Sequence, residues 1–168
     1  EQRENGAIPC AIPNCLSDDL SGSALSDDAV VTVPWALYKT YGDVRMLEKH
    51  FPCIKKWIEF ISSRVRDGLW PVDYQYGDWL ALDARANSCI GITDVSLIAS
   101  AAYARAADLA ARIADVLDRD YDARNFRALH KKIKRAYQRE FITATGRLAV
   151  NTQTAHILTL RFDLCEEE

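Results

Sequence analysis

The sequence has few of the residues and patterns that mark several protein classes. It holds only seven glycines and five prolines in 168 residues, which argues against a collagen-like or low-complexity chain. No apolar run approaches the roughly 20 residues that a membrane-spanning helix needs. A net charge of −3 gives no reason to expect binding to nucleic acid or to an anionic membrane surface. What remains is the composition of an ordinary helix-leaning globular chain.

Compact chemical motifs are also missing. The three histidines are far apart, and the five cysteines form no Cys-x-x-Cys pair, so no metal site is predicted. An odd number of cysteines without clustering argues against a disulfide framework. There is no G-x-S-x-G elbow, no G-x-G-x-x-G and no phosphate loop. We therefore predict no metal and no organic cofactor.

The two ends of the chain are polar. It opens in a loop without an initiator Met or a signal peptide, and it stops at Glu166-Glu167-Glu168 directly after an apolar helical pattern. We therefore expect an internal piece of a longer protein, and we predict no compartment for it.

Helical periodicity dominates the chain, and no segment has a convincing strand pattern. The pattern predicts one unit, residues 1–168, made of a loop at 1–26, helices at 27–66, an aromatic loop at 67–92 and helices at 93–164. Helices joined by short links pack antiparallel as αα-hairpins, so the predicted class is all-α.

The first helices carry specific local signals. Val30, Val33 and Leu37 are predicted to share one buried face, and Gly42 to end that helix as a left-handed cap. Asp43 is predicted to cap the next helix. Pro52 is expected to kink or split that helix. Its apolar stripe is formed by Leu47, Phe51, Ile54, Ile58, Ile61 and Val65.

One basic cluster and two polar motifs remain as candidate sites. The cluster, Lys131, Lys132, Lys134, Arg135 and Arg139, falls between the stripe positions of an amphipathic helix and is interpreted as a solvated face. The first motif runs from Ser26 to Trp35 and places Asp27 and Asp28 where a loop enters a helix. One carboxylate suffices as N-cap, so Asp28 is either a cap or a ligand-binding group.

The second motif, residues 74–83, reads YQYGDWLALD. Aromatic rings beside carboxylates suit sugar binding, because a ring stacks on the C–H face of a pyranose while oxygens accept from its hydroxyls. A loop packed down by its own aromatic side chains fits the same residues equally well.

Three segments together resemble a known family. Residues 28–43 read DAVVTVPWALYKTYGD, residues 76–80 read YGDWL, and residues 141–155 read FITATGRLAVNTQTA. Their order and approximate spacing are similar to the catalytic domain of bacterial α-L-rhamnosidases, glycoside hydrolase family 78. The resemblance covers most of the chain from about Gly6 onward.

The resemblance implies a fold and a set of sugar-binding residues. The fold is a partial (α/α)6 six-hairpin toroid. Asp28 matches the acid of the family's W-x-D-A motif, and Trp79 matches the aromatic of G-D-W in the rhamnose pocket. Asp78, which precedes Trp79, and Gln153, which lies in a D-T-Q-T-like motif, are carried over as well. Ser26 stands where the family usually has an aromatic residue, which weakens one wall of that pocket.

The resemblance also implies that the catalytic groups lie elsewhere. Inversion needs an acid and a base, and the family's acid motif, D-E-R-x-G-W-like, and its downstream glutamate are both missing from this chain. We expect a part of an inverting enzyme that releases terminal α-L-rhamnose from rhamnosides, inactive alone, with exposed apolar faces that favour self-association. Two alternatives stay open, another six-hairpin glycosidase and a non-catalytic helical carbohydrate-binding scaffold.

Overall fold

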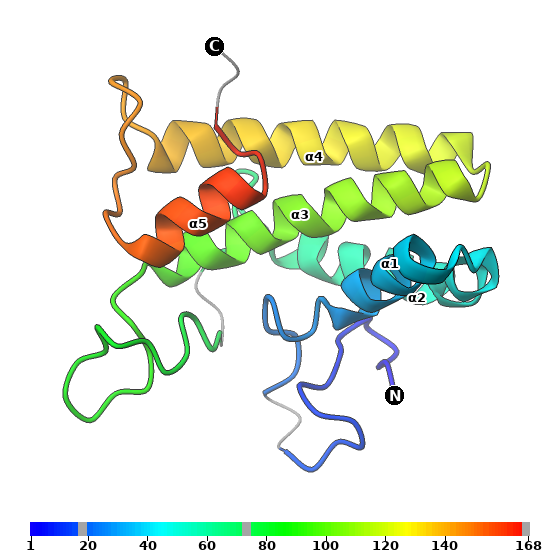
Figure 1. Ribbon diagram of the computed structural model, residues 1–168, viewed down its shortest axis with the longest axis horizontal. Coiled ribbons are helices and arrows are strands. Elements are labelled where there is room, and N and C mark those ends of the chain that lie inside the picture. The colour runs from blue at the N-terminus through cyan, green and yellow to red at the C-terminus, as the bar shows by residue number, and fades with distance from the viewer. Residues whose placement is uncertain (17–19, 72–74, 166–168) are drawn as a thin grey trace.

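A computed structural model describes residues 1–16, 20–71 and 75–165 (Figure 1). Over these ranges the chain forms five helices and three isolated bridges, and no strand. They are α1 (Ala29–Tyr41), α2 (Val44–Arg64), α3 (Val95–Val116), α4 (Asp120–Phe141) and α5 (Gln153–Arg161). The predicted all-α class is confirmed. Tyr74, the first residue of the aromatic motif, and Glu166-Glu167-Glu168 lie outside the described residues.

The helices alternate in direction. Figure 1 shows α1, α3 and α5 running one way and α2 and α4 running back, so that α1–α2 and α3–α4 are antiparallel hairpins. Helix α3 contacts all four other helices. The segment before α1 and the loop between α2 and α3 both hang from the same side of the helices (Figure 1).

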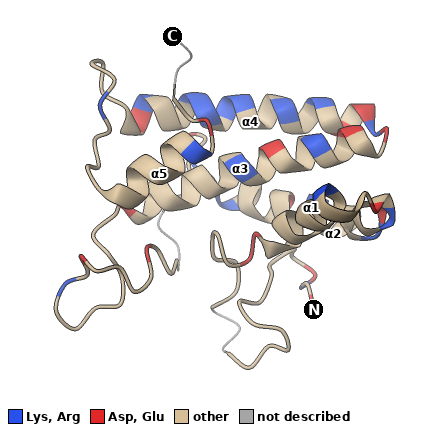
Figure 2. Ribbon diagram, in the orientation of Figure 1, with Lys and Arg blue, Asp and Glu red and all other residues tan. Residues whose placement is uncertain are grey.

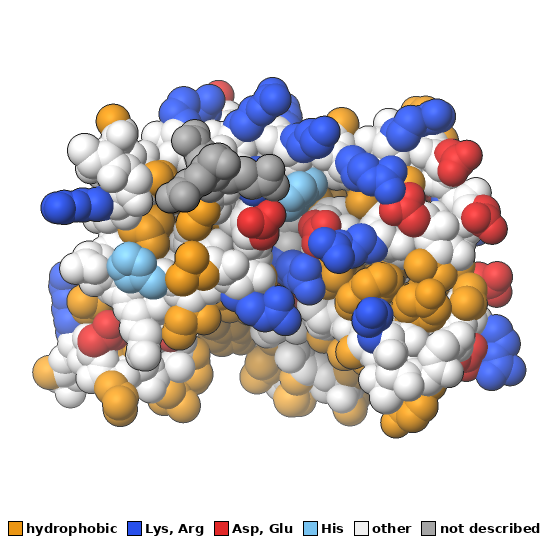
Figure 3. Space-filling view, turned by 45° about the horizontal axis from the view of Figure 1, so that its top comes forward, with side chains coloured by type: hydrophobic (Ala, Val, Ile, Leu, Met, Phe, Trp, Pro, Cys, Tyr) orange, Lys and Arg blue, Asp and Glu red, His pale blue; other side chains and the backbone are white. Residues whose placement is uncertain are grey.

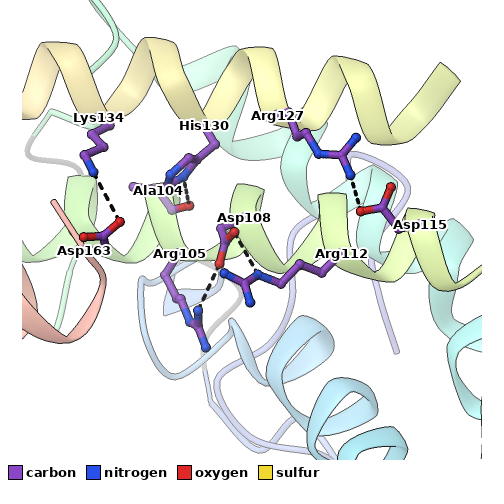
Figure 4. Close-up of polar contacts among 9 residues, drawn as sticks. All are labelled: Ala104, Arg105, Asp108, Arg112, Asp115, Arg127, His130, Lys134 and Asp163. Carbon is purple, nitrogen blue, oxygen red and sulfur yellow. Dashed lines mark hydrogen bonds and ion pairs between the residues drawn. The ribbon is translucent and has the colours of Figure 1, made fainter. Parts of the chain in front are cut away.

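Helix α3 is central because its side chains are small. Nearly every residue from Leu97 to Ala107 is buried, and most of them are alanines, which let neighbouring backbones approach closely. Its charged residues lie on the remaining face. There Asp108 accepts from Arg105 and Arg112 at 3.0 Å each, and Asp115 pairs with Arg127 of α4 (Figure 4). Because the charged side chains are confined to this face, the buried faces of α3 are apolar.

Helix α2 follows the predicted pattern closely. The stripe residues from Leu47 to Ile61 are buried, and Asp43 accepts a bond from the backbone N–H of Arg45 at 3.0 Å. Gly42 ends α1 in the left-handed conformation, as predicted. Pro52 was expected to kink or split this helix, and the split is wrong, because α2 is continuous through it. Packing of the surrounding stripe outweighs the one backbone bond that a proline removes.

The predicted buried face of α1 is wrong by one position. Val31 and Pro34 are buried, whereas Val33 is 51% exposed. Both sets of residues satisfy the helical spacing, so periodicity alone does not choose between them. The choice falls to tertiary packing, which turns the Val31–Pro34 side toward the core.

The basic residues of α4 form a solvated face, as predicted. Lys131, Lys132, Arg135 and Arg139 are exposed, and Lys134 bonds to Asp163 at 3.3 Å. Figures 2 and 3 show these cations along the outer side of α4, with acidic and hydrophobic side chains among them. Within the described ranges, no helix combines the length and the apolar character needed to cross a bilayer.

Candidate functional site

Two loops meet at the start of the parallel helices. We call residues 20–28, which lead into α1, the acidic loop, and residues 75–92, which lead toward α3, the aromatic loop. Gln75 joins them, because its side-chain Oε1 accepts from the backbone N–H of Ala24 at 2.7 Å and from the Ser23 hydroxyl at 3.2 Å. The tertiary structure thus brings the two polar motifs of the sequence side by side.

Asp28 lies at the N-cap position of α1 but is bonded elsewhere. Its Oδ2 accepts from the backbone N–H of Leu25 at 2.9 Å, and its Oδ1 accepts from the indole Nε1 of Trp57 at 2.8 Å. The residue is only 5% exposed. Each carboxylate oxygen can accept two bonds, so both retain capacity for one further donor.

Asp27 organises the acidic loop. Its Oδ2 accepts from the backbone N–H groups of Gly22 and Ser23, both at 2.7 Å, and its Oδ1 accepts from the Ser26 hydroxyl at 2.9 Å. Of the two roles left open for Asp28, a side-chain cap on α1 is therefore excluded, although the residue occupies the N-cap position. Both side chains reach back to residues before the helix or across to α2, because the loop folds over them.

Burial shifts the protonation of both acids. Removal from water raises the pKa of Asp28 to about 6. The hydrogen bonds from Trp57 and Leu25 lower this pKa, and the nearby charge of Asp27 raises it. Burial also raises the pKa of Asp27, while its bonds from Ser26, Ser23 and Gly22 act in the opposite direction. A carboxyl group that titrates near pH 6 can accept or donate a hydrogen bond close to neutral pH.

A small cavity opens beside Asp28. It has a volume of about 260 Å³ and lies between α1 and α3. Thr32 and Trp35 border it from α1, and Arg105 from α3. A hydroxyl, an indole face and a guanidinium around one carboxyl give both apolar and hydrogen-bonding surface.

Trp79 stands at the surface of the aromatic loop and is 51% exposed. The Tyr76 ring meets it edge-on, with centroids 5.5 Å apart. A bridge between Trp79 and Ile90 and a 2.6 Å bond from the Leu80 N–H to the Cys89 carbonyl close the loop on itself. The loop is thus folded, with one aromatic ring left open to solvent.

The segments that carry Asp78 and Gln153 are brought together, although 75 positions separate the two residues in the sequence. The Thr154 hydroxyl, next to Gln153, donates to Asp78 Oδ2 at 2.5 Å. Thr93 donates to the same oxygen at 3.4 Å, so Asp78 ties the aromatic loop to the starts of α3 and α5. Gln153 begins α5 with its side chain exposed.

Three residues become important only in the structure, since Gln75 lies in the second motif without an assigned role and Ser23 and Trp57 lie outside both motifs. Gln75 is 8% exposed, and its Nε2 has no partner among the described residues. Such a buried donor costs about 1–3 kcal/mol unless a further group meets it. Ser23 is fully buried between the loops, and Trp57 supplies the donor to Asp28. Trp57 was predictable as apolar core, but its bond depends on a contact across 29 residues.

The loop end offers groups that suit a neutral polyol. It has an open indole face, buried carboxyls with spare acceptor capacity and an exposed amide. Over the described part of the chain, no group of three or more His, Cys, Asp or Glu side chains is arranged to hold a metal ion.

Comparison with known proteins identifies the chain. The family model for the bacterial alpha-L-rhamnosidase 6 hairpin glycosidase domain matches residues 1–168. An alpha-L-rhamnosidase of Streptomyces avermitilis is 37% identical over 163 residues, which are 97% of this chain and 15% of that protein. The chain spans 15–18% of the length of the curated relatives that it matches.

Solved structures agree. The structure of the Streptomyces avermitilis alpha-L-rhamnosidase complexed with L-rhamnose matches with a TM-score of 0.84 and 35% identity, over 98% of this chain and 15% of that one. That of the Aspergillus terreus enzyme matches with a TM-score of 0.90 and 33% identity, over 97% and 19%. The helical hairpins described above are therefore those of a six-hairpin glycosidase domain, and the chain belongs to the bacterial α-L-rhamnosidase family.

Proposed function

We propose that the chain forms one sugar-binding sector of an inverting α-L-rhamnosidase that releases terminal α-L-rhamnose from rhamnosides. The family match over the whole chain supports this, together with one structural observation. The loops that carry Asp28 and Trp79 bind each other at the start of the parallel helices, through Gln75.

Each proposed residue has a distinct role in this sector. The exposed Trp79 ring stacks on the apolar face of the sugar, and Asp28 accepts from its hydroxyls through the oxygen capacity that Trp57 and Leu25 leave. Asp78 and Gln153 supply further polar contacts from the aromatic loop and the start of α5. None of the four is assigned as the catalytic acid or base.

The acid and the base are proposed to come from residues outside this chain. An inverting enzyme needs one carboxyl to protonate the leaving oxygen and another, roughly 6.5–9.5 Å away, to activate water. Asp27 and Asp28 are adjacent and already bonded to several donors of the protein. We therefore expect the isolated chain to bind sugar at most, and to lack turnover.

Hydrolysis of an aryl α-L-rhamnoside tests this proposal, with the 168-residue chain and the longer polypeptide that carries it measured side by side. Only the longer polypeptide is expected to cleave. Trp79→Ala should then raise KM about tenfold or more, since stacking on the ring is lost. Tyr41→Ala, an exposed aromatic at the far end of α1, is the matched control and should leave KM unchanged.

Three outcomes would count against parts of the proposal. Cleavage by the isolated chain would show that it contains a catalytic pair. Cleavage of aryl glucosides in place of rhamnosides would favour another six-hairpin glycosidase. Sugar binding without hydrolysis by either protein would favour a non-catalytic carbohydrate-binding scaffold.

We also propose that apolar faces of the isolated chain self-associate. Val33 on α1 and Ile157 and Leu160 on α5 are 51%, 54% and 71% exposed. Val33 borders a hollow that it shares with residues of α2, and α5 contacts α3 but none of the other described helices. Apolar faces of this kind usually meet another surface.

A further inference from the structure

Gln75 is the residue through which the aromatic loop is fixed to the acidic loop. We infer that it is a positioning residue for the sugar site, setting the place of Trp79 relative to Asp28 through its bonds to Ser23 and Ala24. This inference rests on the proposed function, since it assigns Trp79 and Asp28 to one sugar.

The acidic loop packs against helix α2. Gly22 lies so close to Phe60 of α2 that an added Cβ would stand 2.5 Å from the ring, and its backbone has a φ of +92°. Trp57, which donates to Asp28, stacks on the same Phe60 ring with centroids 5.4 Å apart. The loop is therefore seated on the buried aromatic side chains of α2.

The aromatic loop depends on the acidic loop for its own position. Gln75 Oε1 accepts from Ala24 and Ser23, and the backbone N–H of Tyr76 donates back to the Ser23 hydroxyl at 3.2 Å. Tyr76 in turn holds the Trp79 ring edge-on. A line of direct contacts thus runs from the core through Ser23, Gln75 and Tyr76 to the exposed ring.

The second attachment of this loop does not replace the first. Asp78 ties the loop to Thr93 and Thr154, which belong to the starts of α3 and α5. That attachment fixes the loop to helices other than α2, on which the acidic loop sits. The bonds of Gln75 and Tyr76 to Ser23 and Ala24 join the aromatic loop directly to the acidic loop.

The side-chain amide makes two substitutions informative. Gln75→Met keeps the length of the side chain but removes the acceptor, so the N–H of Ala24 loses its partner. Gln75→Glu keeps an acceptor oxygen and replaces the amide donor, which has no partner among the described residues, with a second carboxyl oxygen. If the side-chain oxygen at position 75 positions the loops, Gln75→Glu should restore much of the activity that Gln75→Met removes.

The test uses the longer polypeptide that carries this chain, with an aryl α-L-rhamnoside as substrate. Gln75→Met should lower kcat/KM about tenfold, mainly through KM, because a displaced ring no longer meets the sugar. Gln75→Glu should recover most of that loss. Gln138→Met is the matched control, since Gln138 lies on α4 and its side chain donates to the Leu164 carbonyl, outside both loops. This substitution should leave KM unchanged.

A double-mutant cycle separates positioning from general structure. In the Trp79→Ala background, Gln75→Met should have little further effect on KM, because the ring it positions is already gone. An undiminished tenfold effect in that background would overturn the inference.

Amide hydrogen exchange tests whether Gln75 joins the two loops, independently of activity. Gln75→Met should speed amide exchange in peptides covering residues 20–28 and 75–80, and Gln138→Met should not. Unchanged exchange in both loops would overturn the inference even in an active enzyme. If the wild-type polypeptide hydrolyses no rhamnoside, the proposed function fails, while the exchange result still shows whether Gln75 joins the loops.

Discussion

The helical body and the loop end of this chain are held together by different interactions. The body consists of α1 to α5 around the alanine-rich α3, and its core is a single cluster of buried apolar side chains. The loop end is held by short polar bonds to buried groups, above all Asp27, Asp28 and Gln75. The body gains free energy roughly in proportion to the area it buries, whereas the loop end depends on donors and acceptors meeting at set distances.

This difference separates stability from function. Apolar packing tolerates many substitutions of similar size, so it determines whether the chain folds. A buried carboxyl or amide is costly unless it is bonded, and it fixes one arrangement of the groups around it. We therefore expect body substitutions to change stability at every pH, and loop substitutions to change sugar binding and the pH dependence of stability.

The largest effect on stability is expected in the body. Ile113 of α3 is fully buried, so Ile113→Ala should lower the free energy of unfolding by about 2–5 kcal/mol through lost contacts and a cavity. Urea unfolding followed by circular dichroism measures this. Arg112→Ala is the neighbouring control, because its ion pair with Asp108 is exposed and worth at most about 1 kcal/mol. Equal costs for the two variants would contradict the division between core and surface.

A smaller and pH-dependent effect is expected at Asp28. Its pKa in the folded chain is about 6, above the ordinary 3.8, so the folded state holds the proton more tightly. Its contribution to stability is fully present below pH 4 and is lost as pH rises through 6. A difference of about two pKa units sets a limit of about 3 kcal/mol. Asp28→Asn should remove this part of the slope in unfolding experiments between pH 4 and 7.

Two other acids sharpen the measurement on Asp28. Asp27 also has a raised pKa, so a weaker slope of the same sign should remain in Asp28→Asn. Asp43 has a lowered pKa from its bonds to Arg45, so its contribution is present at neutral pH and is lost as pH falls. Asp43→Asn should therefore change the slope in the opposite direction, and only below about pH 4, because the lowered pKa places the titration of Asp43 beneath its ordinary 3.8. A wild-type slope that survives unchanged in Asp28→Asn would show that this carboxyl is not the titrating group.

The smallest effect on folding is expected at the exposed apolar faces. Leu160→Lys should change the free energy of unfolding by less than about 0.5 kcal/mol, because the side chain is 71% exposed. It should nevertheless reduce self-association of the isolated chain, measured by sedimentation velocity across a range of concentrations. A chain that stays monomeric at every concentration, with or without the substitution, would remove the proposal of self-association.

Much of the body could be predicted from the sequence. The stripe of α2, its Asp43 cap and the Gly42 terminus follow from periodicity and from side chains that bond within one helical turn. The face of α1 could not be predicted, because Val33 and Val31 fit the helical period equally well. The continuity of α2 through Pro52 likewise depends on the packing around it.

The sequence by itself determined the helical hairpins, the family and the two motifs that carry the candidate site, because these depend on local periodicity and on short runs of residues. Only the tertiary structure decided which groups the site residues bond to. Asp28 bonds to Trp57 across 29 positions, and Gln75 bonds to Ala24 across 51. Such bonds arise where packed helices bring distant loops together and shut out water, so no local pattern in the sequence contains them.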